Sequence, residues 1–101
     1  MEKVNINREK NTENCIALID YENCSNLTEI PLNIYTELII FSGAKQNNVA
    51  LPVSAFPEAV KLTLRHVSET SRNNVDFHLV LELGQYVYRY GSEKEYHIVI
   101  R

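Results

Sequence analysis

The chain is poor in the residues on which small secreted and zinc-binding domains depend. Its 101 residues include two cysteines, Cys15 and Cys24, and no tryptophan. Two cysteines at this spacing provide neither a disulfide framework nor a zinc knuckle, so we expect a reduced, cytoplasmic protein. No stretch approaches the roughly 20 apolar residues that a membrane-spanning helix needs. The first 14 residues are polar and charged, unlike a signal peptide.

An excess of positive charge is also missing. The net charge of −3 creates no overall positive field to attract nucleic acid. Any contact with RNA must therefore be local, or assisted by bound cations. A glycine-rich phosphate loop, a nucleophile elbow and a zinc signature are all absent. The composition, 45% hydrophobic and 23% charged, is that of one ordinary globular domain with one modest core.

Aspartate occurs only twice, as Asp20 and Asp76. Asp20 closes the apolar run 15–20, and Asp76 follows a polar segment and opens the apolar run 77–81. A carboxylate beside apolar sequence is costly to bury unless something pairs with it, and one shared divalent metal ion would explain both positions. The alternative is that Asp20 ends a strand and Asp76 favours a helix start.

Four segments have the pattern of β-strands. The unbroken apolar run 15–20 is typical of a strand that is buried on both faces. Residues 35–42 have the highest β-propensity and end at Gly43, whereas 60–68 alternates like a half-exposed strand near an edge. A last apolar strand is expected at 96–100. Strands that alternate with helical pieces predict an α/β fold with a mainly parallel sheet of about four strands.

Residues 76–90 fit a helix, although their end also alternates like a strand. We predict a helix that is capped by Asn73 or Asn74 and ended by Gly91. The helical period groups six residues on one face, namely Phe77, Val80, Leu81, Gly84, Val87 and Tyr88.

The other segments are predicted to be short or irregular. Residues 1–12 carry balanced charges without an apolar period, so we expect a polar, weakly ordered tail before a domain that spans 13–101. A short helix is expected near 25–29, capped by one of its first two residues. Two prolines bracket a helical turn around 53–59.

Potential metal ligands gather where the first strand is expected to end. In an open α/β sheet, ligands bind beyond the carboxyl ends of the strands. Glu22 and Asn23 follow Asp20 in one loop, and hard cations such as Mg²⁺ and Mn²⁺ prefer such oxygen ligands. Asp76 at the helix start would face the same loop, where the helix N-terminus also stabilises its negative charge.

A second polar loop follows the second strand and contains Lys45, Gln46 and Asn48. On a parallel sheet this loop lies on the same side as Asp20, where it either contacts the phosphates of a substrate or is simply solvated. The histidines lack the pair spacing of zinc ligands, so structural roles are expected for His66, His78 and His97.

Four short motifs, taken in order, resemble those of PIN-like nucleases close to the NYN group. Residues 18–23 have an Asp-x-Glu-Asn element after the first strand, and 41–46 have a Phe-x-Gly element after the second. Residues 75–79 have an Asp-Phe-His helix start, and 96–99 have a His-Ile-Val strand. The resemblance covers roughly residues 15–101.

The resemblance implies a three-layer α/β/α PIN-like fold with strand order 3-2-1-4. It also implies a metal-dependent endoribonuclease that hydrolyses RNA phosphodiesters with Mg²⁺ or Mn²⁺. Asp20 and Asp76 would then bind the metal, and Glu22 and Asn23 would support catalysis.

One departure from the family pattern lowers the expected activity. The family continues past its fourth strand with an Asp-Lys-Gly-x-Asp pattern, whereas this sequence stops at Arg101. We therefore expect a fragment or a naturally short relative, weak or inactive by itself. The alternative function is a catalytically inactive PIN-like module that binds a protein or RNA partner, or a second copy of the chain.

Overall fold

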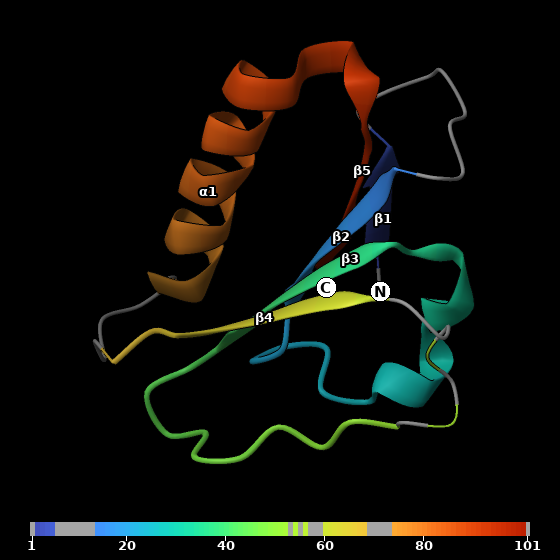
Figure 1. The fold of residues 1–101 in the computed structure, drawn as a ribbon. Coiled ribbons are helices and arrows are strands. Elements are labelled where there is room, and N and C mark those ends of the chain that lie inside the picture. The colour runs from blue at the N-terminus through green and yellow to red at the C-terminus, as the bar shows by residue number, and fades with distance from the viewer. Residues whose placement is uncertain are drawn as a thin grey trace.

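Five strands form one sheet in the computed structural model (Figure 1). They are β1 (Glu2–Asn5), β2 (Cys15–Asp20), β3 (Glu37–Ser42), β4 (Lys61–His66) and β5 (Glu95–Ile100). Their order is β1-β5-β2-β3-β4, in which β5, β2, β3 and β4 are parallel and β1 is antiparallel to β5. The structure describes residues 2–5, 14–52, 54, 56, 60–68 and 74–100.

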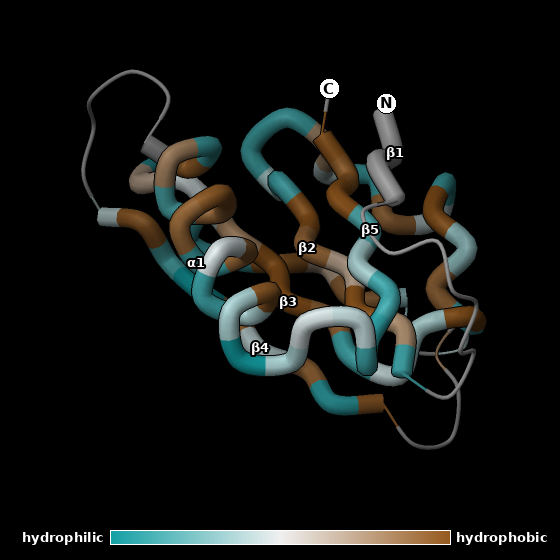
Figure 2. Tube along the Cα trace, turned by 90° about the horizontal axis from the view of Figure 1, so that it is seen from above, coloured by the Kyte–Doolittle hydropathy of each residue, from teal (hydrophilic) through white to brown (hydrophobic). Residues whose placement is uncertain are grey.

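The parallel part of the sheet has the predicted order. The four expected strands are β2, β3, β4 and β5, and their arrangement β4-β3-β2-β5 is the order 3-2-1-4. β2 and β3 lie inside the sheet with neighbours on both sides, and all their residues are buried. Figure 2 shows the corresponding hydrophobic colouring of these inner strands. β4 lies at an edge and is mostly exposed, which agrees with its alternating sequence.

The prediction of a weakly ordered tail was wrong for residues Glu2–Asn5. These residues form β1, which pairs with β5 from Glu2–Ile100 to Asn5–His97. An isolated polar segment carries no periodic signal, but a sheet edge supplies backbone donors and acceptors that such a segment can pair with. The rest of the expected tail, 6–12, lies outside the described residues.

Two apolar cores lie on the two faces of the sheet. Helix α1 (Asn74–Tyr90) covers one face, where Val75, Leu79 and Leu83 pack on the sheet. The opposite face is covered by the 3₁₀ turns η1 (Leu27–Glu29) and η2 (Leu32–Ile34), and partly buried residues from 49–62 pack against the same core. Among the described residues, turns and extended chain thus form the third layer, on the side away from α1 in Figure 1.

The cap of η1 and the end of α1 follow the expected chemistry. Asn26 caps η1 by accepting a hydrogen bond from the Thr28 backbone N–H at 3.3 Å. Helix α1 ends at Tyr90, and Gly91 follows with a φ of +55°, a left-handed conformation that favours glycine. The turn η4 (Gly91–Glu93) then leads into β5. The proposed Asn73 cap and most of the turn expected at 53–59 lie outside the described residues.

The apolar face of α1 that was predicted from the helical period is largely exposed to solvent. Phe77, Val80, Leu81 and Tyr88 are 64%, 61%, 52% and 93% exposed, and Gly84 is exposed as well. Of the predicted face, Val87 packs partly against the core. Apolar residues occur around much of this helix, so periodicity alone cannot decide which side meets the sheet. None of the described helices is long and apolar enough to span a membrane.

Candidate active site

Asp20 is the last residue of β2 and lies at the carboxyl-terminal edge of the parallel strands. The five residues before it are apolar or thiol-bearing and belong to a strand that is buried on both faces. The strand therefore carries the Asp20 side chain into the interior, where it is 1% exposed. A carboxylate so deeply buried requires polar partners.

The turn after β2 supplies two of those partners through Asn23. The Asn23 backbone N–H donates to Asp20 Oδ1 at 3.3 Å, and Asn23 Nδ2 donates to Asp20 Oδ2 at 2.8 Å. The Cys24 N–H donates to the Asp20 carbonyl at 2.8 Å and closes the turn. Asn23 thus orients both carboxylate oxygens of Asp20.

Asp76 is the second carboxyl group at this site and comes from helix α1. It lies in the first turn of α1, and its carboxyl hydrogen-bonds that of Asp20. This hydrogen bond is the largest cause of a raised Asp76 pKa, followed by partial burial and by the negative charges of Asp20 and Glu22. The two carboxyl groups therefore lie next to each other, although they come from distant parts of the sequence.

Glu22 lies beside the same pocket and packs over Gly43, the residue that follows β3. A Cβ atom at position 43 would collide with the Glu22 carboxylate. Glycine at this position therefore leaves space for the Glu22 side chain, whose charge also acts on Asp76. The third acidic group of the site is positioned by the end of β3 as well as by the turn after β2.

The loop after β3 lies beside the Asp20 turn, as its place in a parallel sheet predicts. The Gln46 side chain accepts from the Gly43 N–H at 2.8 Å and donates to the Tyr21 carbonyl at 3.1 Å. The Ala50 N–H donates to the Tyr21 hydroxyl at 3.0 Å. Gln46 is thus engaged in holding the loop, whereas Lys45 and Asn48 are exposed there.

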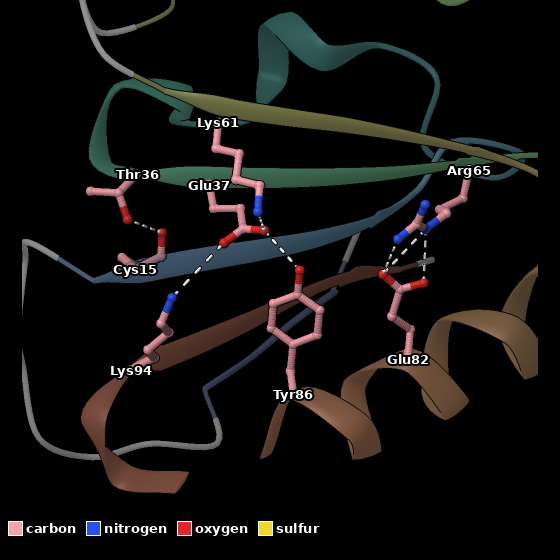
Figure 3. A network of polar contacts seen from close by, with 8 residues as sticks. All are labelled: Cys15, Thr36, Glu37, Lys61, Arg65, Glu82, Tyr86 and Lys94. Carbon is pink, nitrogen blue, oxygen red and sulfur yellow. Dashed lines mark hydrogen bonds and ion pairs between the residues drawn. The ribbon is translucent and has the colours of Figure 1, made fainter. Parts of the chain in front are cut away.

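Two histidines lie near this edge, although the sequence had given no reason to select them. His66 ends β4, and its Nδ1 lies 3.1 Å from the Ser42 hydroxyl at the end of β3. Together with His78 from α1 it lines a cavity of about 220 Å³. The ion pair of Arg65 with Glu82, at 3.1 Å, connects β4 to α1 at the same cavity (Figure 3). Only tertiary packing brings these residues together.

The donor set of the pocket fits a hard divalent cation. Asp20, Asp76 and Glu22 offer carboxylate oxygens, and repulsion by the charges of Asp20 and Glu22 contributes to the raised pKa of Asp76. Mg²⁺ and Mn²⁺ prefer carboxylate oxygens and retain several water ligands. A cation held by Asp20 and Asp76 would relieve this repulsion.

Comparison with known families matches residues 14–101 to the PIN domain. The chain belongs to the PIN domain family. PIN domains are nuclease-type domains that generally use divalent metal ions. The parallel sheet of this PIN domain, with α1 on one face, agrees with that family's fold. Searches of curated proteins and of solved structures found no match.

Proposed function

We propose that this PIN domain is a metal-dependent endoribonuclease that hydrolyses RNA phosphodiester bonds. The hydrogen-bonded pair of Asp20 and Asp76 is the observation that carries this proposal. The two side chains come from distant parts of the sequence, and their mutual repulsion costs stability unless a cation or a proton is present. Natural proteins retain such costly arrangements mostly at functional sites.

Asp20 and Asp76 are the proposed ligands of Mg²⁺ or Mn²⁺. When bound, such a cation lowers the pKa of a coordinated water and stabilises the negative charge that develops on the phosphate. Asn23 holds the Asp20 carboxylate in one orientation through its two hydrogen bonds. Glu22, placed over Gly43, adds negative charge near the same ligands and would accept a proton or orient a water.

The RNA would lie along the carboxyl-terminal edge of the sheet. Lys45 and Asn48 are exposed on the loop beside the Asp20 turn, where they would contact the phosphate backbone. Because the chain has a net charge of −3, this local contact and the bound cation must supply the attraction for RNA. His66 and His78, which line the cavity beside β4 and α1, would contact a nucleotide next to the cleaved bond.

The test is cleavage of single-stranded RNA by the purified chain in the presence of Mn²⁺. We expect slow cleavage that falls about a hundredfold or more in Asp20→Asn and in Asp76→Asn. Each substitution removes the negative charge of a proposed metal ligand, and even a displacement of a reacting group by about 1 Å has an effect of this size. Glu93→Gln is the matched control, since Glu93 is an exposed acid in η4, outside the Asp20 turn and β3 loop. Cleavage that persists in both aspartate variants would contradict the assignment.

A second candidate function is an inactive PIN module that binds RNA or protein. The burial of Asp20 and its two hydrogen bonds from Asn23 favour this alternative, because they stabilise the turn without any metal. Undetectable cleavage by the parent chain, together with RNA binding that Asp20→Asn leaves unchanged, would favour the module over the nuclease.

A further inference from the structure

A second group of metal-ligand side chains lies at the other end of β2 from Asp20. Cys15 is the first residue of β2, and it is paired in register with Glu95, the first residue of β5. His97 follows Glu95 two residues later, on the same face of β5. One ligand atom from each of Cys15, Glu95 and His97 lies within 4.8 Å of the other two. A six-residue strand spans about 16 Å, which separates this group from Asp20.

These three side chains are buried and contact one another directly. His97 Nε2 lies 2.6 Å from Glu95 Oε2, and Cys15 Sγ donates to the same oxygen at 3.5 Å. Cys15, Glu95 and His97 are 3%, 9% and 8% exposed. The other oxygen, Glu95 Oε1, is buried and has no hydrogen-bond partner in the described part of the chain. A buried carboxylate oxygen without a partner is costly, and such an atom needs an explanation.

Glu37 shows how the same fold satisfies another buried carboxylate. It accepts a hydrogen bond from the Tyr86 hydroxyl at 2.8 Å and pairs with Lys61 at 3.9 Å and Lys94 at 4.0 Å (Figure 3). Glu95 is buried at the same edge of the sheet, yet its Oε1 lacks such a partner. The difference points to a ligand for Glu95 that is not a side chain.

We propose that Cys15, Glu95 and His97 form a binding site for one zinc ion. A thiolate, an imidazole and a carboxylate are the three ligand types that zinc takes in proteins, and three protein ligands leave a fourth position for water. Zinc binding releases the proton of the Cys15 thiol, so that the two negative ligands and the divalent ion make a neutral buried cluster. The thiolate distinguishes this site from the oxygen-only pocket at Asp20, which suits Mg²⁺ or Mn²⁺.

Tyr35 supports the proposed site from behind His97. Its hydroxyl lies 2.9 Å from His97 Nδ1, and the two rings contact edge to face at 5.3 Å. Burial raises the pKa of Tyr35, and the negative charge of Glu95 raises it further, so the hydroxyl stays protonated. It can donate to Nδ1 in the metal-free protein and accept from Nδ1–H when Nε2 binds zinc. Such an outer hydrogen bond fixes the ring of a metal-binding histidine.

The backbone holds the starts of the two strands in place. The Thr36 N–H and hydroxyl both donate to the Cys15 carbonyl, at 2.9 and 3.1 Å, and Figure 3 shows the hydroxyl contact. The Glu95 N–H donates to the Asn14 carbonyl at 2.9 Å. Cys15 and Glu95 therefore need little rearrangement to bind an ion, which limits the entropic cost of binding.

The test is titration of the reduced, metal-free chain with Co²⁺, followed by competition with Zn²⁺. We expect one equivalent of Co²⁺ to produce thiolate-to-metal charge-transfer absorption, and Zn²⁺ to abolish it. Cys24→Ser should bind with an affinity within about twofold of the parent, because Cys15 is then the only thiol left. Glu95→Gln should lower zinc affinity about tenfold or more.

X-ray absorption of the zinc-loaded parent chain counts the ligands without any substitution. We expect one sulfur at about 2.3 Å and nitrogen or oxygen at about 2.0–2.2 Å. Absence of the charge-transfer band, its loss in a folded Cys24→Ser variant, or a zinc shell without sulfur would each overturn the proposal. In Cys24→Ser the band requires the Cys15 thiolate, so Co²⁺ bound near Asp20 cannot produce it.

Discussion

The carboxyl of Asp76, in the first turn of α1, hydrogen-bonds the carboxyl of Asp20 at the end of β2. The bond to Asp20, partial burial and the nearby negative charges raise the pKa of Asp76, so this carboxyl holds its proton more tightly than an isolated one. A divalent cation would replace that proton. The binding of metal and of protons at this pocket should therefore be competitive.

The first prediction follows from the raised pKa of Asp76. Because the folded state holds this proton more tightly than the unfolded state, its stabilising effect is complete below the ordinary pKa of 3.8 and is lost as the pH rises through the raised value. In Asp20→Asn the Asp76 pKa should fall towards 3.8, as measured by the pH dependence of its carboxyl ¹³C shift. An Asp76 pKa that is the same in Asp20→Asn and in the parent would be inconsistent with the carboxyl pair.

The second prediction concerns where Mn²⁺ binds. Paramagnetic broadening of amide signals should reach Asp20, Glu22 and Asp76 at the lowest Mn²⁺ concentrations, because these residues offer carboxylate oxygens at the proposed site. Gly43→Ala, which displaces the Glu22 carboxylate, should weaken this binding without removing any ligand. Broadening that begins at Glu93, an exposed acid in η4, would show that the pocket is not the preferred site.

The orientation of α1 makes the third prediction. Leu79 is 1% exposed and packs on the sheet, whereas Leu81, on the opposite side of the helix, is 52% exposed. Leu79→Ala should lower the free energy of unfolding by about 2–5 kcal/mol, since it leaves a cavity in the core. Leu81→Ala should lower it by less than about 1 kcal/mol. Urea unfolding of both variants measures the difference, and the reverse ranking would show that the other helix face meets the sheet.

The fourth prediction tests the buried Glu37 network. Tyr86→Phe removes the hydroxyl that donates to Glu37 and should destabilise the chain by about 1–2 kcal/mol, while Tyr88→Phe, at a 93% exposed position, should change stability by less than about 0.5 kcal/mol. Burial and the bond to Glu37 raise the pKa of Tyr86 to about 12. Its contribution to stability should therefore be present below pH 10 and be lost between about pH 10 and 12.

The pH dependence of stability provides the control for the prediction about Tyr86. Thermal unfolding between pH 9 and 12 should show a smaller loss of stability in Tyr86→Phe than in the parent, because Tyr86 is no longer there to ionise. Part of the loss should remain, because Tyr35 and Tyr96 also have a raised pKa. Equal losses in the parent and Tyr86→Phe would mean that Tyr86 does not ionise with a raised pKa.

The sequence alone determined the four parallel strands and the first half of the candidate active site. An unbroken apolar run such as 15–20 can only be satisfied by burial on both faces, so β2 had to lie inside the sheet, with Asp20 at its end. Asn23 lies within hydrogen-bonding range of Asp20 because it comes only three positions later in the sequence. These features depend on local propensity and short sequence separations, which one sequence records directly.

Tertiary structure decided the features that depend on contacts between distant segments. The apolar side of α1 that meets the sheet, the pairing of β1 with β5 and the hydrogen bond between Asp76 and Asp20 are of this kind. So is the group of Cys15, Glu95 and His97, since β2 and β5 are far apart in sequence and adjacent in the sheet. Neither hydrophobic period nor residue spacing records which segments become neighbours, because that choice is made by the packing of the whole chain around its two cores.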